Sequence, residues 1–146
     1  MRVGVDTNVL VHAHIPAMPE HARVRARLQE LLRAEDTTLF VCPLVLHELV
    51  HVITDARRFE PPVTMSDAGA TARLYLDRTN VQCLPIDEDA VRRAFDLLAE
   101  HSLGRKRIAD TLFAATLLEN GVERLLTCNA RDFQRFGLTL EDPRHA

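Results

Sequence analysis

The first ten residues are the feature that most constrains how this chain folds. Residues 2–5 form a strand-like run, and Asp6, Thr7 and Asn8 follow it directly before apolar residues resume at helical spacing. This order is typical of a buried strand that leads into a helix in an α/β sheet. In such folds ligands bind beyond the carboxyl ends of the strands, which is where Asp6 is expected. Helix capping is the alternative role for these three residues, because their types are preferred N-caps.

Strand-like and helical runs alternate along the whole chain. Strands are predicted at residues 2–5, 39–42, 81–84, 124–127 and 138–140, and helices at residues 8–13, 20–34, 43–57, 66–78, from 88 on, and 107–119. This alternation predicts the α/β class, in a three-layer α/β/α arrangement around a central, mostly parallel sheet. The 146 residues contain no composition shift or repeat, so they are expected to form a single domain over residues 1–146.

Composition limits the classes of partner. The net charge of −3 gives no global basic field, so a polyanion would be held by a local patch or through metal ions. No apolar run approaches the roughly 20 residues of a membrane span, and the chain begins with a strand rather than a signal peptide, which favours the cytoplasm. An odd number of cysteines near the ends of apolar runs predicts buried, reduced thiols at Cys42, Cys83 and Cys128.

Acidic residues recur where strands end or the following helices begin. Asp6 follows the first strand, and Glu48 lies in the apolar helix at residues 43–57, where we expect it to be buried. Asp110 lies in the first turn of a later helix, and Asp132 follows the fourth strand. Each has an ordinary alternative as a cap, a helix-dipole partner or a turn residue. In a parallel sheet, however, these positions share one edge.

Carboxylates that converge there repel one another, and no Lys or Arg is expected among them. Divalent cations relieve such repulsion, and oxygen-only ligands select Mg²⁺ or Mn²⁺ over zinc. The sequence therefore predicts a metal site for phosphoryl chemistry, in which the catalytic and metal-binding residues are Asp6, Glu48, Asp110 and Asp132.

A second constellation shares one of these acids. His47-Glu48-Leu49-Val50-His51 is a literal H-E-x-x-H pattern on a predicted helix, as in zinc metalloproteases. Its extended form requires a glycine and a third histidine, and the chain has Thr54 and Arg57 at those positions. A zinc protease remains the alternative enzyme.

Four ordered motifs resemble those of PIN-domain nucleases, and in particular the VapC-type toxins of toxin–antitoxin pairs. They are residues 5–8, Glu48, residues 110–115 and residues 126–133, and the resemblance covers nearly the whole chain. It implies a PIN-like fold and a metal-dependent endoribonuclease that hydrolyses RNA phosphodiester bonds. It also implies inhibition by a cognate antitoxin and, commonly, a homodimer.

The resemblance also implies roles for individual residues. Asp6, Glu48 and Asp110 match the three acidic metal ligands of the family. Thr7 and Asn8 match the polar pair beside the first acid. Thr127, Asn129 and Asp132 match the region after the fourth strand, which supplies the fourth ligand. Some members have an acid at the position of Asn129, so Asp132 is expected to serve or assist, with one or two metal ions.

A basic run precedes Asp110 by three to five residues. Arg105, Lys106 and Arg107 lie close enough in sequence to meet an RNA phosphate near the metal, although such runs are more often solvated surface. A third hypothesis is a non-catalytic PIN-like module that binds RNA or a partner without cutting it.

Overall fold

Five parallel strands form the centre of the molecule in this computed structural model, which describes residues 1–145. Their order across the sheet is β3-β2-β1-β4-β5, and every strand pairing is parallel. The strands are β1 (Arg2–Val5), β2 (Thr38–Val41), β3 (Val81–Cys83), β4 (Arg124–Leu126) and β5 (Thr139–Glu141). The first strand of the sequence is therefore the central strand of the sheet, which is why its residues from Val3 to Val5 are buried.

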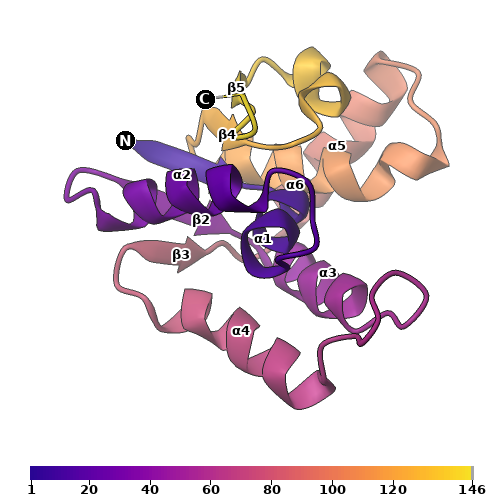
Figure 1. Cartoon of the computed structure of the whole chain (residues 1–146). Coiled ribbons are helices and arrows are strands. Elements are labelled where there is room, and N and C mark those ends of the chain that lie inside the picture. Colours follow the sequence, from indigo (N-terminus) through magenta and orange to yellow (C-terminus); the bar gives the residue numbers. More distant parts are fainter. Residues whose placement is uncertain (146) are drawn as a thin grey trace.

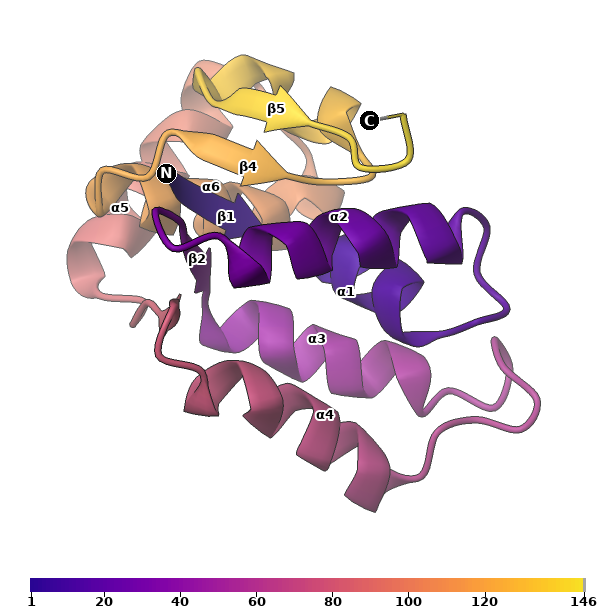
Figure 2. The same cartoon turned by 60° about the vertical axis from the view of Figure 1, so that its left-hand side comes forward.

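Helices cover both faces of this sheet. They are α1 (Thr7–His14), α2 (His21–Arg33), α3 (Pro43–Ile53), α4 (Met65–Asp77), α5 (Glu88–Glu100) and α6 (Ile108–Glu119), with short 3₁₀ helices η1 (Arg105–Arg107) and η2 (Ala130–Phe136). Figures 1 and 2 show α1 to α4 on one side of the sheet and the α5–α6 pair on the other. The predicted three-layer α/β/α class is confirmed, and the sheet is wholly parallel within residues 1–145.

The ends of two helices differ from those predicted. Helix α3 stops at Ile53 instead of residue 57, because the backbone N–H of Asp55 donates to the carbonyl of Val52, three residues before it, and the chain then turns. Helix α4 begins at Met65, one residue before the predicted start, because the side chain of Thr64 accepts a hydrogen bond from a backbone N–H of the first turn.

Close packing brings α6 against the central strand. A Cβ atom at Gly4 would lie 2.7 Å from Cδ1 of Leu117, so only glycine allows this approach without a shift of the fully buried leucine. Phe113 and Ala114 are buried on the same helix. The contact places the first turn of α6, which carries Asp110, near the carboxyl end of β1.

Two other sequence expectations concern thiols and membranes. Cys42 and Cys128 are buried, Cys83 is half-buried, and none of the three forms a disulfide in the described part of the chain. Among residues 1–145, no helix has the length and apolar character needed to cross a membrane. Residue 146, the last of the predicted domain, lies outside the described residues.

Candidate active site

Asp6 occupies the junction between β1 and α1 and has both carboxylate oxygens hydrogen-bonded. It is the N-cap of α1, and its Oδ1 accepts from the backbone N–H of Thr7 at 2.8 Å. Its Oδ2 accepts from the amide of Asn8 at 3.1 Å and from the hydroxyl of Thr127 at 2.8 Å. These hydrogen bonds fix the direction of the carboxylate. Asp6 itself is buried, with an exposed fraction of 7%.

A pocket of about 250 Å³ opens beside Asp6. Its lining comes from four separate segments of the chain and comprises Asp6, Thr7, Asn8, Val11, His12, Met18, Glu48, Val52, Arg58, Asp110 and Asn129. Six of the residues predicted as catalytic or supporting are among them. The fold therefore brings together at one place acids that are more than a hundred residues apart in sequence.

The end of β4 is joined to the end of β1 by side-chain hydrogen bonds. Thr127 is fully buried, and its hydroxyl donates to Asp6 and accepts from the backbone N–H of Asn129 at 3.0 Å. The N–H of Cys128 donates to the side-chain oxygen of Asn8 at 3.0 Å. Thr127 is not part of the pocket wall, and its contact with Asp6 orients the carboxylate.

Glu48 differs from the sequence expectation in its burial. Helix α3 buries one face, which includes Leu46 and Leu49, and Glu48 lies on the exposed side. Its Oε2 accepts from the hydroxyl of Thr7 at 3.2 Å and faces the pocket. The prediction of a carboxylate buried among leucines and valines was wrong, because α3 is apolar on one face rather than all round.

The two less exposed acids of the pocket hold protons unusually tightly. Burial, together with the charges of Asp110 and Glu48, raises the pKa of Asp6 to about 7 against the opposing effect of its hydrogen bonds. Burial likewise raises the pKa of Asp110 to about 6, with contributions from the charges of Asp132 and Glu48. Both carboxyls are therefore costly to ionise without a nearby positive charge.

Asp132 has a different partner from the other acids. Its Oδ1 forms an ion pair with Arg107 at 2.7 Å, and it is not among the residues that line the pocket. Asn129 lines the pocket in its place. The expectation that no Lys or Arg lies among the carboxylates was wrong, because Arg107 pairs with Asp132 and Arg58 lines the pocket wall.

Comparison with known proteins identifies the family. The PIN domain family model matches residues 3–138 of the chain. This chain belongs to the PIN domain family. Similar relatives include the VapC ribonuclease Mb2897 of Mycobacterium bovis, 32% identical over 132 residues that cover 90% of this chain and 88% of the relative. Ribonuclease VapC24 of Mycobacterium tuberculosis is 28% identical over 137 residues, covering 94% and 92%.

Solved structures share the PIN domain fold. The crystal structure of VapBC2 from Rickettsia felis, bound to a DNA fragment from its promoter, matches with a TM-score of 0.68. The alignment covers 97% of this chain and 98% of that chain at 20% sequence identity. At this identity the match bears on the fold alone.

The H-E-x-x-H pattern does not form a zinc site in this PIN domain. His47 and His51 are exposed, and His47 lines an apolar groove between α3 and α4 while Glu48 lines the acidic pocket. Within residues 1–145, no three His, Cys, Asp or Glu side chains are grouped so that they could hold one metal ion. A catalytic zinc needs three protein ligands, so the zinc protease alternative was wrong.

The same pocket fits a hard divalent cation that keeps part of its water. Mg²⁺ is usually bound through one or two carboxylates, with waters and substrate phosphates completing six oxygens, and does not need a closed protein cage. The polar lining offers carboxylate, hydroxyl and amide oxygens. Because Asp6 and Asp110 are both costly to ionise, a cation between them would relieve that cost.

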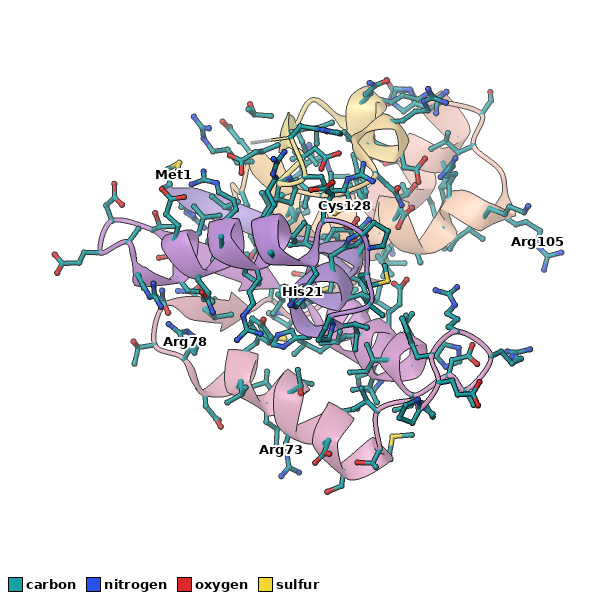
Figure 3. The ribbon with its side chains drawn as sticks, in the orientation of Figure 1. Met1, His21, Arg73, Arg78, Arg105 and Cys128 are labelled. Carbon is teal, nitrogen blue, oxygen red and sulfur yellow. The ribbon has the colours of Figure 1, made fainter. Side chains whose placement is uncertain are left out.

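The predicted basic run lies on η1. Arg105 and Lys106 are exposed, and Figure 3 shows Arg105 extending outward from the segment between α5 and α6. Arg107 is committed to Asp132. Sequence reasoning missed Arg58 in the pocket wall, and the Arg57-Arg58 pair after α3 was the available signal.

Proposed function

We propose that this PIN domain, acting as one unit over residues 1–146, is a metal-dependent endoribonuclease and the toxin of a toxin–antitoxin pair. The observation that carries the proposal is the meeting of Asp6, Glu48 and Asp110 at one pocket. The names of the relatives, which describe VapC ribonucleases, support the reaction class.

Mg²⁺ or Mn²⁺ is the proposed cofactor, held by Asp6, Glu48 and Asp110 with Asn129 or Asp132 completing the site. Because no three of the described acids are grouped closely enough to hold one ion directly, we propose that part of this contact runs through water bound to the ion. A cation there supplies activation of water and neutralisation of charge on the leaving oxygen. The chain's own residues do the rest: Thr127 and Asn8 aim the carboxylate of Asp6, and Thr7 donates to Glu48. Arg105, Lys106 and Arg107 are assigned to the flanking RNA.

The partners are proposed from the same comparisons. VapBC2 was solved as a complex, which supports a cognate antitoxin for this chain. A homodimer is proposed as well, and Phe95 and Ile108, which are 62% and 50% exposed, are apolar side chains available for such a contact. The free cysteines support a reducing compartment, the cytoplasm.

RNA cleavage tests the proposal directly. We expect the purified chain to cut single-stranded RNA when Mg²⁺ or Mn²⁺ is added and to stop when EDTA is present. Asp110→Asn should lower the rate by at least about 10- to 100-fold, since loss of a ligand costs no less than loss of a residue that supports one. Circular dichroism checks that the variant is folded.

The control is Asp96→Asn, because Asp96 is an exposed acid on α5 outside the pocket and outside the ion pairs of the described residues. Full cleavage by Asp110→Asn would refute the site. RNA binding without products in excess Mn²⁺ would favour the non-catalytic module instead.

A further inference from the structure

Arg58 brings a permanent positive charge to a pocket that is lined by acids. Within the described residues 1–145, it is the only Arg or Lys that lines the pocket, together with Asp6, Glu48 and Asp110. It lies on the segment between α3 and α4, far along the sequence from the basic run of η1. Its presence there needs a physical reason, because the acids already have a proposed cation.

The backbone around Arg58 is held in place. The N–H groups of Arg58 and Phe59 both donate to the carbonyl of Asp55, at 3.0 and 3.1 Å. Phe59 packs against the hydrophobic core, and the N–H of Val63 donates to the carbonyl of Ile53 at 2.9 Å. The position of Arg58 beside the pocket is therefore set by an ordered turn.

The guanidinium of Arg58 is also free to bind a ligand. The nearby Asp55 carboxylate is taken by Arg57, whose backbone N–H and Nε donate to its Oδ1 at 2.8 and 3.3 Å. Among the ion pairs of residues 1–145, Arg58 takes part in none. An arginine carries five N–H donors in a planar fork, and here all of them are available.

We propose that Arg58 binds a phosphate of the RNA at or next to the bond that is cut, an assignment that rests on the proposed function. A polyanion that enters a pocket of carboxylates is repelled, and one fixed cation in the wall offsets that repulsion. The arginine fork matches two phosphate oxygens. Neither end of the basic run offers an unpaired guanidinium at the pocket, because Arg105 extends outward and Arg107 is paired with Asp132.

RNA binding to a chain that does not cut tests this role. In an Asp110→Asn background, fluorescence anisotropy measures the Kd of a short single-stranded RNA over a series of KCl concentrations. Arg58→Ala should raise the Kd about tenfold, as for one charge-assisted contact. It should also reduce the slope of log affinity against log salt by about 0.7, the value for one phosphate contact on a single strand.

Arg57→Ala is the matched control, because it removes the same charge from the neighbouring position, outside the pocket wall. We expect its Kd to change less than about twofold, because Arg57 is already paired with Asp55 and does not line the pocket, whereas Arg58 does. In the chain with Asp110 intact, Arg58→Ala should raise KM more than it lowers kcat, and Arg58→Lys should recover part of the loss. Arg58→Gln repeats the charge removal with more of the side chain's bulk kept, and circular dichroism verifies folding.

The outcomes separate this inference from the proposed function. Equal effects of the two alanine variants, or no RNA binding by Asp110→Asn, would overturn the role of Arg58. If Arg58→Ala raised the affinity for Mn²⁺ without changing the affinity for RNA, the role in RNA binding would also be overturned, since Arg58 would then only neutralise the charge of the acids. RNA binding that depends on Arg58 in a chain that never cuts RNA would overturn the nuclease proposal alone.

Discussion

Asp6 has a structural role as the N-cap of α1, and we propose a second, chemical role for it as a metal ligand. Its Oδ1 caps α1, its Oδ2 is held by Thr127 and Asn8, and the residue lines the pocket. Capping and ligand binding were alternatives in the sequence, and the geometry makes them compatible. Capping alone would not require the carboxyl to lie in a position where burial raises its pKa to about 7.

Asp110→Asn should make the protein more stable at neutral pH. The pKa of Asp110 is raised from 3.8 to about 6, so the folded state binds its proton more tightly than the unfolded state. The contribution of this tighter proton binding to the free energy of unfolding is complete below pH 3.8 and is lost as the pH rises through 6. After allowance for partial exposure, we expect a gain of about 1–2 kcal/mol at pH 7.5 and almost none near pH 4, measured by urea unfolding.

Asp132→Asn is the control for this effect. Asp132 has Arg107 as an ion-pair partner at 2.7 Å, so its loss should leave stability unchanged or slightly lower at pH 7.5. If both variants gave the same gain, the cause would be the repulsion between the two acids, since the charge of Asp132 also raises the pKa of Asp110, and not the burial of Asp110 itself. A loss of stability in Asp110→Asn would contradict the repulsion between the pocket acids.

Single residues show where sequence reasoning ends. Asp6 and Asp110 were predictable because strand ends and helix starts locate them at one edge of a parallel sheet. The exposure of Glu48 was not, since it depends on which face of α3 meets its neighbours. The pairing of Asp132 with Arg107 depends on how η2 packs against η1 and α6, which local patterns do not encode.

At the scale of elements, α6 contains two buried threonines in opposite states. The hydroxyl of Thr116 donates to the carbonyl of Leu112 at 2.8 Å, whereas the hydroxyl of Thr111 has no hydrogen-bond partner within the described residues. Both residues are fully buried. A buried hydroxyl without a partner retains its desolvation cost without compensation.

Thr111→Val should therefore stabilise the protein, by about 1 kcal/mol relative to Thr116→Val. Both substitutions exchange a hydroxyl for a methyl group on one helix, so they share the same change of helix propensity. Thermal unfolding at a fixed pH measures the difference. Equal effects, or a larger gain for Thr116→Val, would indicate that Thr111 finds a partner.

The elements themselves were largely predictable. The five strands and the major helices follow from apolar periodicity and from Pro, Gly and Asn signals. The 3₁₀ helix η2 was expected only as a turn, because its aromatic residues Phe133 and Phe136 are ordered by packing against the core. Strand order was beyond the sequence, since nothing local places β1 between β2 and β4.

At the scale of the whole molecule, the sheet is completed from the two ends of the chain. The hydrogen bond between Thr127 and Asp6 joins residues 121 positions apart, and β4 supplies one neighbour of the central strand. A chain that stops at residue 120 should lose cooperative unfolding, because the apolar β1 would be left as an unpaired edge.

Circular dichroism during heating measures this loss of cooperativity. The control is a chain that stops at residue 141, which retains all five strands and should still unfold cooperatively. A sharp transition in the shorter chain would show that β1 and β2 with their helices fold without β4.

The central place of β1 has a consequence for the time at which the pocket exists. Ribosomes add about 5–20 residues per second, so Asp6 waits on the order of ten seconds before Thr127 is synthesised. Until then the carboxylate has no strand beside it on that flank and no threonine to aim it. The nascent polypeptide thus carries Asp6 through the synthesis of 121 further residues before the pocket can assemble.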